Sequence, residues 1–256
     1  MFDHDHPIYE QLLKLIREHR FLTTHQLVRL TITEYGSLRS AKRQTLRHLW
    51  TLHDRQFLTR LERRIGGWQG GSTVTIWTLT TKGMRHLTGS RSRLRPHHYS
   101  TTFLEHTLAV AEMNILLNEL SVQHPELQVE VRNEPECWRR YLNEHGVTTT
   151  LKPDLSVTVT SPEYVDRYFL EVDRATENPG RVIGKCWQFI HHRRSGTEQK
   201  RTDGIYPFVV WIVPYEKRKA QLVRAMDSEP KLQRELFIVV TPNELLPLIR
   251  DGPSTA

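Results

Sequence analysis

The order of helical and strand patterns after residue 100 constrains the fold of this chain more than any other feature. An amphipathic helix is predicted first, and the later elements follow in the order strand, strand, strand, helix, strand, helix, strand, helix. The segments are 101–120, 127–132, 148–160, 165–174, 181–193, 206–213, 215–228, 235–241 and 243–250. Three closely spaced strands favour a meander, and a strand that follows a helix favours a parallel crossover. We therefore predict an α/β (α+β) domain with a mixed sheet at 101–256.

The positive charge of the chain is concentrated in its first third. Residues 1–90 carry 14 Lys and Arg against 7 Asp and Glu, whereas the rest carries 22 of each kind, for a net charge of +7. The pI is about 9.5. Because a solubilising charge is more often spread along a chain, this distribution favours a polyanionic partner for the first segment.

The first 90 residues show three helical patterns followed by two strands around a glycine-rich turn. The third helix, within 37–57, places Leu46, Leu49, Trp50 and His53 on one face and basic residues on another. This element order predicts a winged helix-turn-helix at 1–90, with the third helix in the major groove of double-stranded DNA. The expected DNA-binding residues are Arg39, Lys42, Arg43, Arg47, Arg63 and Arg64. The alternative is that these charges only solvate an exposed face.

A polar segment separates the two predicted domains. Residues 91–100 carry Arg91, Arg93, Arg95 and Pro96, which is typical of a basic linker. No apolar run approaches the roughly 20 residues of a membrane span, and no secretory signal is visible at the start. Cys137 and Cys186 are too isolated for a disulfide framework or a zinc site. We expect a cytoplasmic protein without a membrane partner.

Acidic residues stand at the ends of two apolar strand patterns. Asp154 begins the second strand, while Glu171 and Asp173 end the third. Burying an unpaired carboxylate costs several kcal/mol, so such acids need partners. Neighbouring strands would bring Asp154 close to Glu171, and clustered carboxylates suit Mg²⁺ or Mn²⁺. The alternative is a structural ion-pair network with the basic residues that follow, namely Arg174, Arg181 and Lys185.

Two stretches, KPDLSVTV at 152–159 and FLEVD at 169–173, resemble the motif of PD-(D/E)xK nucleases. The fuller pattern resembles the replication-relaxation family of plasmid and mobile-element proteins, in which a winged helix-turn-helix precedes a degenerate nuclease-like domain. The resemblance thus implies a restriction-endonuclease-like fold for residues 101–256. The stretches that carry the resemblance are LEHTLAVAEMNILL, KPDLSVTV, YFLEVDRATE and GKCWQFI, and the resemblance covers nearly the whole chain.

The resemblance implies a role at a plasmid or element origin, in replication, relaxation or mobilisation, with Asp154 and Glu171 as metal ligands. The sequence departs from the nuclease motif because Asp173 occupies its lysine position, and we expect Asp173 to belong to the same catalytic site as Asp154 and Glu171. Lys185 on the next helix is the expected replacement, and Glu112 or Glu105 on the first helix would complete the acid cluster. We thus expect metal-dependent nicking of DNA. The alternatives are a non-enzymatic initiator with a degenerate assembly domain and a regulator with a ligand-sensing domain. A homodimer is an assembly that the sequence allows.

Overall fold

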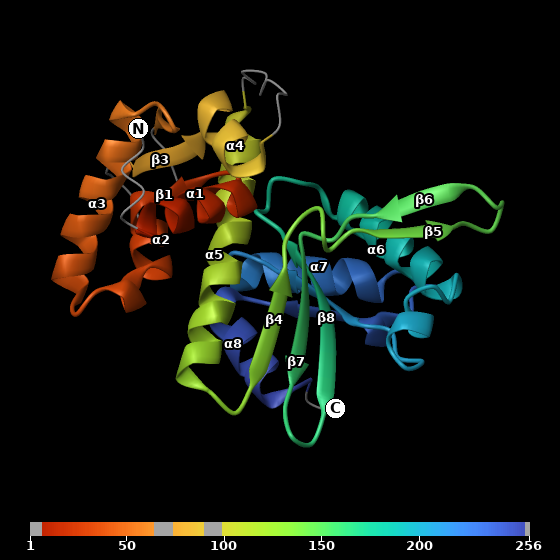
Figure 1. Ribbon diagram of the computed structural model, residues 1–256. Helices are drawn as coiled ribbons and strands as arrows, with labels where there is room; N and C mark the ends of the chain where they lie inside the picture. Colours follow the sequence, from red (N-terminus) through yellow and green to blue (C-terminus); the bar gives the residue numbers. More distant parts are fainter. Residues whose placement is uncertain (1–6, 64–73, 90–98, 254–256) are drawn as a thin grey trace. The chain divides into compact units, whose positions relative to one another are not determined.

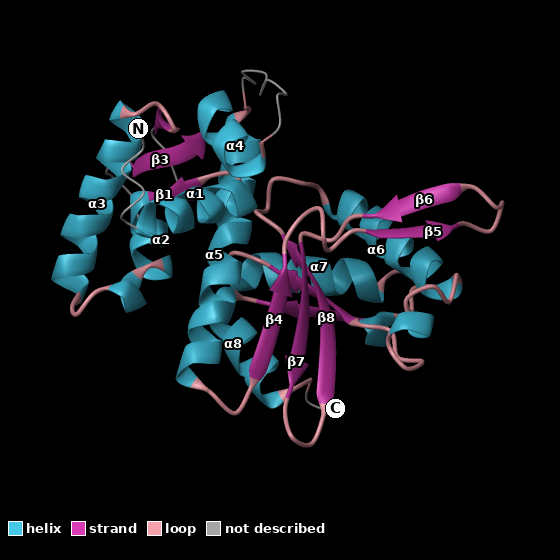
Figure 2. Ribbon diagram, viewed as in Figure 1, coloured by secondary structure: helices cyan, strands magenta, loops and turns pink. Residues whose placement is uncertain are grey.

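The computed structural model describes residues 7–63, 74–89 and 99–253. Tertiary contacts divide the chain into two units, residues 1–115 and 116–256, and each is described by itself below (Figures 1 and 2). The described residues form eight α-helices and a five-stranded mixed sheet, which confirms the predicted mixed α/β class. None of these helices combines the length and the apolar character that crossing a membrane requires.

The first unit consists of short helices and a small antiparallel sheet with the strand order β1-β3-β2. Its elements are α1 (Pro7–His19), β1 (Leu22–Thr23), α2 (Thr24–Leu30), α3 (Leu38–Asp54), β2 (Leu58–Arg63), β3 (Val74–Leu79), α4 (Thr81–Thr88) and the first half of α5 (Thr101–Gln123). Helix α2 begins after Thr23, whose side chain accepts a hydrogen bond from the Gln26 backbone N–H in a capping box.

The buried face of α3 differs from the predicted one. Leu46 and Trp50 are 41% and 37% exposed, whereas Leu49 is fully buried. Thr45 also lies inside, and its hydroxyl is 3.1 Å from that of Thr31. A polar residue can occupy this helix face because its hydrogen-bonding group has a partner there. The helix is therefore rotated relative to the apolar pattern, and Leu46 and Trp50 share the outer face with the basic side chains.

The first half of α5 belongs to the first unit. Leu104 and Leu108 are buried with Phe21 and Ile76 in one apolar cluster. Burying one such leucine contributes about 1.5–3 kcal/mol, so this half helix is an integral part of the unit's core. The linker predicted at 91–100 lies almost wholly outside the described residues. The predicted boundaries, 1–90 and 101–256, remain predictions, and the contacts divide the chain at residue 115 instead.

The second unit contains the five-stranded sheet, whose strand order is β10-β9-β8-β7-β4. Its elements are β4 (Gln128–Arg132), β5 (Arg139–Leu142), β6 (Thr148–Leu151), β7 (Leu155–Thr160), β8 (Val165–Val172), α6 (Pro179–Arg194), β9 (Phe208–Ile212), α7 (Glu216–Asp227), β10 (Phe237–Val240) and α8 (Pro242–Asp251). Strands β4, β7 and β8 form an antiparallel meander, and β8, β9 and β10 are parallel. The predicted meander and crossover are confirmed.

The strand predicted at 148–160 is in fact two strands. It breaks at Pro153, which has no N–H to donate to a ladder, so β6 and β7 join different sheets. Strand β6 pairs with β5, which the sequence analysis missed, in a separate two-stranded hairpin (Figure 1). The four-residue pattern of β5 is too short for a period of two to be recognised.

Helices α6 and α7 cover one face of the five-stranded sheet. Their apolar side chains, including Cys186, Phe189 and Leu222, form one buried cluster with Phe169 and Trp211 of the sheet. Successive strand residues point to opposite faces, so the odd-numbered positions of β8 face these helices. This alternation decides where the acidic residues near the end of β8 lie.

A buried histidine in this core makes the stability of the fold dependent on pH. His192 on α6 is fully buried, and its Nδ1 is 2.9 Å from the Tyr206 hydroxyl. Burial, together with Arg139 and Arg201, lowers the pKa of His192 from 6.5 to about 4. As the pH falls below 6.5, His192 takes up a proton in the unfolded chain but not in the folded one. The free energy of unfolding should therefore fall between pH 6.5 and about 4, by at most about 1.4 kcal/mol per pH unit.

The His192→Gln variant should therefore lose less stability than the wild type between about pH 7.5 and about pH 5. Urea denaturation at the two pH values measures this difference. His145→Gln is the matched control, because the His145 side chain is 77% exposed. Equal losses in the wild type and in His192→Gln would contradict the assignment of a neutral buried histidine.

Candidate functional site

The candidate site lies where β7 begins and β8 ends. The antiparallel register pairs Leu155 with Leu170, so it leads Asp154 to the position opposite Glu171. The Asp154 backbone N–H donates to the Leu170 carbonyl at 3.2 Å, and an Asp154 carboxylate oxygen accepts from the Val172 N–H at 2.8 Å. Asp154 is 6% exposed and Glu171 is 1% exposed. The predicted neighbouring acids are thus brought together and buried.

Glu171 forms an ion pair with Lys185, which α6 presents to the end of the strand. Its Oε2 accepts from the Lys185 ammonium, while its Oε1 is buried and has no hydrogen-bond partner among the described residues. Burial raises the pKa of Glu171, although the Lys185 ammonium opposes this rise and favours the carboxylate. The carboxylates of Glu171 and Asp154 raise the pKa of Lys185, so this lysine stays charged. A buried, half-paired carboxylate leaves room for one further cationic partner.

A third acid near this pair was missed by the sequence analysis. Glu134 raises the pKa of both Glu171 and Lys185 through its charge. The segment that follows Glu134 contacts the chain just before β7, where the Cys137 thiol donates a hydrogen bond to the Pro153 carbonyl at 3.0 Å. No strand or helix pattern marks Glu134. Its position depends on this tertiary contact, so no local signal could have identified it.

Asp173 faces the same side of the sheet as Glu171, but its carboxylate is engaged elsewhere. Arg218 of α7 holds it with two hydrogen bonds, Nε to Oδ2 at 2.7 Å and Nη2 to Oδ1 at 3.0 Å, and both side chains are nearly fully buried. The Ala175 N–H also donates to Asp173, at 3.1 Å. These contacts do not support its predicted role in catalysis. They form a buried ion pair that connects the end of β8 to α7.

The remaining predicted residues belong to the first unit. Both carboxylate oxygens of Glu112 are engaged there, by Arg29 and Gln26, and these contacts do not support its predicted role as a metal ligand. The predicted basic residues of α3 are all exposed, namely Arg39, Lys42, Arg43 and Arg47. Arg64 and the side chain of Arg63 lie outside the described residues, as does the predicted wing turn.

The donor set at the candidate site is small. In the described part of the chain, no three His, Cys, Asp or Glu side chains gather closely enough to hold a metal ion. Two carboxylates, Asp154 and Glu171, remain as ligands of the kind that Mg²⁺ and Mn²⁺ prefer, and a site of this type usually adds waters and substrate oxygens. The buried thiol of Cys137 is not a nucleophile, because burial raises its pKa to about 12.

Comparison with known families covers most of both units. A family model described as replication-relaxation matches residues 13–208, a segment that includes Asp154, Glu171 and Lys185. The chain belongs to the replication-relaxation family. Membership in this family supports a role in plasmid or mobile-element replication or relaxation. No curated protein and no solved structure matches the chain.

Proposed function

We propose that this replication-relaxation protein binds double-stranded DNA of a plasmid or mobile element through its first unit. We further propose that Asp154, Glu171 and Lys185 form the site that nicks the DNA. The observation that carries the proposal is the Oε1 atom of Glu171, a buried carboxylate oxygen without a hydrogen-bond partner among the described residues. A polar atom in that position costs free energy unless something binds it. A divalent cation shared with Asp154 would bind it.

Each residue of the site has a defined task in this proposal. Asp154 and Glu171 would hold Mg²⁺ or Mn²⁺, which when bound polarises a phosphate and lowers the pKa of a water. Lys185, held next to Glu171 by their ion pair, would stabilise the negative charge that develops on the phosphate. The lysine reaches this position from a helix and not from the strand, which compensates for Asp173 at the lysine position of the motif.

A second function is favoured by a different observation. Glu171 already has Lys185 as a partner, and Asp173 is neutralised by Arg218. These two ion pairs connect β8 to α6 and α7, as they would in a degenerate nuclease-like domain that serves assembly. In that case the protein would be a non-enzymatic DNA-binding initiator or regulator.

Incubation of the full-length protein with supercoiled plasmid carrying its own element's origin separates the two functions. With Mg²⁺ or Mn²⁺ present, conversion to open circles is expected from a nickase. Binding without conversion would instead support the initiator.

DNA binding by the first unit can be tested on α3. Arg43 and Arg47 are both exposed on the outer face of this helix, as expected for the recognition helix of a winged helix-turn-helix. Replacing both by alanine should weaken binding of duplex DNA at least tenfold. It should also lower the slope of log K against log salt by about 0.9 for each phosphate that the variant no longer neutralises.

Arg17→Ala is the control for this experiment, since Arg17 is also exposed but lies on α1. Fluorescence anisotropy across a salt series measures both quantities. If affinity and slope are the same in the double variant and the wild type, α3 is not the recognition helix.

A further inference from the structure

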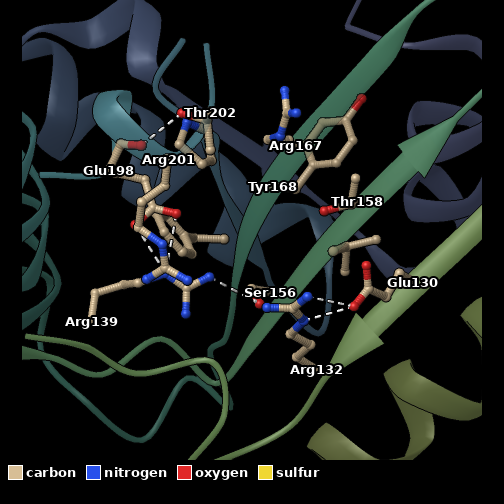
Figure 3. Close-up of a pocket in the computed structure, with 13 residues that line it drawn as sticks. Glu130, Arg132, Arg139, Ser156, Thr158, Arg167, Tyr168, Glu198, Arg201 and Thr202 are labelled. Atoms are coloured by element: carbon tan, nitrogen blue, oxygen red, sulfur yellow. Dashed lines mark hydrogen bonds and ion pairs between the residues drawn. The ribbon is translucent and has the colours of Figure 1, made fainter. Parts of the chain in front are cut away.

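A pocket rich in arginine lies on the five-stranded sheet of the second unit (Figure 3). It has a volume of about 200 Å³, below the roughly 300 Å³ at which pockets for whole small molecules begin. Its charged lining consists of Arg132, Arg139, Arg167, Arg201, Glu130 and Glu198. The size and the excess of cations suit a single oxyanion group better than a cofactor.

The pocket opens on the same face of the sheet as the candidate site. Arg167 lies opposite Thr158, which in turn lies opposite Glu130, and directly paired residues point to one face. Because side chains alternate along a strand, Arg167 and Glu171 of β8 point to the same side. Four positions separate them, which at about 3.3 Å per residue is about 13 Å.

The cations of the pocket differ in how well they are compensated. Arg139 forms a buried pair with Glu198 at 2.9 Å, and Arg132 forms an exposed pair with Glu130 at 2.7 Å. Arg167 is 3.8 Å from Asp203, whose side chain is 93% exposed, so solvent screens this contact strongly. Arg201 is exposed at the rim. Arg167 and Arg201 are therefore the cations best placed to attract an anion.

Hydroxyl groups of the lining complement these cations. Ser156 and Thr158 line the same pocket, whereas the Thr202 hydroxyl donates to the Glu198 carbonyl at 2.8 Å and is already engaged. Guanidinium groups bind phosphate oxygens through their planar fork of N–H donors, and hydroxyls add further donors without adding charge. The combination is typical of phosphate recognition.

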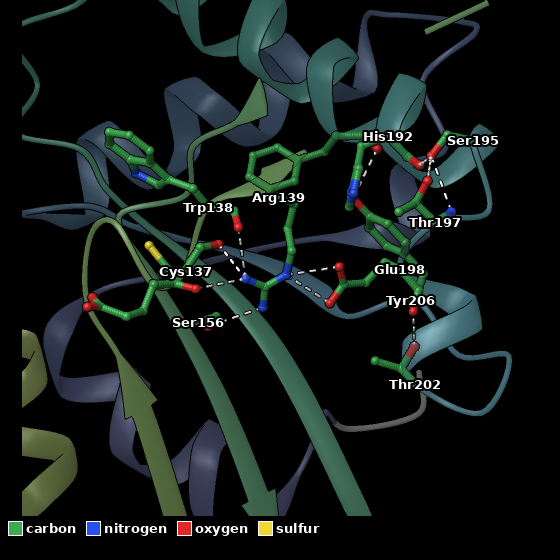
Figure 4. Close-up of polar contacts among 12 residues, drawn as sticks. Cys137, Trp138, Arg139, Ser156, His192, Ser195, Thr197, Glu198, Thr202 and Tyr206 are labelled. Atoms are coloured by element: carbon green, nitrogen blue, oxygen red, sulfur yellow. Dashed lines mark hydrogen bonds and ion pairs between the residues drawn. The ribbon is translucent and has the colours of Figure 1, made fainter. Parts of the chain in front are cut away.

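The wall of the pocket is tied to the candidate site through a short stretch of chain (Figure 4). Arg139 donates to Glu198, to the Cys137 carbonyl at 2.8 Å and to the Ser156 hydroxyl at 3.5 Å. The Cys137 thiol in turn donates to the Pro153 carbonyl, next to Asp154. The pocket and the candidate site are therefore connected by one chain of hydrogen bonds.

We propose that this pocket binds a backbone phosphate of the nucleic-acid strand that enters the candidate site. A separation of about 13 Å lies within the reach of a few nucleotides, because one strand of a duplex already advances about 3.4 Å along the helix axis per nucleotide. The pocket would hold the strand in register while Asp154 and Glu171 face the bond to be cut. The inference rests on the proposed function in taking that strand as the substrate.

The test uses the full-length protein carrying Arg43→Ala and Arg47→Ala, so that binding by the first unit is suppressed. Its affinity for an eight-nucleotide single strand, and separately for inorganic phosphate, is measured in EDTA across a salt series. Adding Arg167→Gln and Arg201→Gln should weaken binding of the oligonucleotide at least tenfold. The slope of log K against log salt should fall by about 0.7 for each phosphate left without an arginine partner. The control is Arg140→Gln, since Arg140 is exposed on β5 and lies outside the pocket lining; it should change neither the affinity nor the slope.

Unchanged oligonucleotide binding in the Arg167 and Arg201 variants, with the melting temperature retained, would overturn the proposal. So would binding of inorganic phosphate without binding of the oligonucleotide, because the pocket would then take a free anion and not a strand. Single substitutions at Arg167 and Arg201 keep the test decisive if the combined variant does not fold. Since no readout requires cleavage, a failure of the proposed nicking activity is seen separately, in the plasmid assay.

Discussion

Replacing Asp154 or Glu171 by alanine is expected to abolish metal-dependent nicking of supercoiled plasmid while duplex DNA binding stays intact. Each variant should also lose the thermal stabilisation that Mn²⁺ gives the wild type, since a ligand that binds only the folded state stabilises it by about 2.7 kcal/mol at 100 times its dissociation constant. The physical reason is that both carboxylates are buried next to each other, where β7 begins and β8 ends. Plasmid nicking and melting temperature with and without Mn²⁺ measure the two effects.

Two further variants make this experiment decisive. Lys185→Ala should keep the Mn²⁺ stabilisation but slow nicking, because the lysine contacts Glu171 and would act on the phosphate. Glu163→Ala, an exposed acid between β7 and β8, should behave like the wild type. The opposite outcome has two parts: Mn²⁺ neither stabilises nor activates the wild type, and Glu171→Ala lowers the stability alone. This outcome would favour a structural ion pair between Glu171 and Lys185 over a metal site.

Replacing Arg218 by alanine is expected to destabilise the second unit by about 3–5 kcal/mol, because it leaves the buried Asp173 carboxylate without its partner. The same substitution removes the hydrogen bond from Arg218 to the Glu177 carbonyl at 2.8 Å. Urea denaturation measures the change in the free energy of unfolding. Plasmid nicking should persist under conditions in which the variant is folded.

The control for this prediction is Arg181→Ala. Arg181 pairs with Glu177 at 3.7 Å, with both side chains more than half exposed, so its loss should cost less than about 1 kcal/mol. The Asp173→Asn variant tests the opposite interpretation. If it loses nicking activity without losing stability, Asp173 belongs to the active site and its ion pair with Arg218 is not purely structural.

Much of the fold follows from local patterns in the sequence. The capping box of α2, the helix patterns and the antiparallel pairing of β7 with β8 all depend on residues close together in the chain. The pairing of Asp154 with Glu171 was also predictable. Pro153 marks a strand start, the apolar run at 168–172 marks a strand end, and antiparallel neighbours bring those two ends together.

Other features depend on partners that are distant in sequence. Thr45 is buried on α3 because Thr31 accepts or donates its hydrogen bond, so the inner face of that helix could not be read from apolar spacing alone. The short segment β5 is a strand because it pairs with β6, and its own four residues carry no strand pattern. Likewise, the first half of α5 joins the core of the first unit through Phe21 and Ile76, which no helical period indicates.

The sequence by itself determined the mixed α/β class, the alternation of strands and helices after residue 165 and the presence of buried acids at two neighbouring strand ends. Only the tertiary structure decided what each acid does. Asp173 meets Arg218, Glu112 meets Arg29, and Glu171 meets Lys185 with one oxygen left unpartnered among the described residues. A buried carboxylate needs a partner in every fold, but which cation reaches it depends on how helices pack on a sheet, and that packing is set by contacts far apart in the chain.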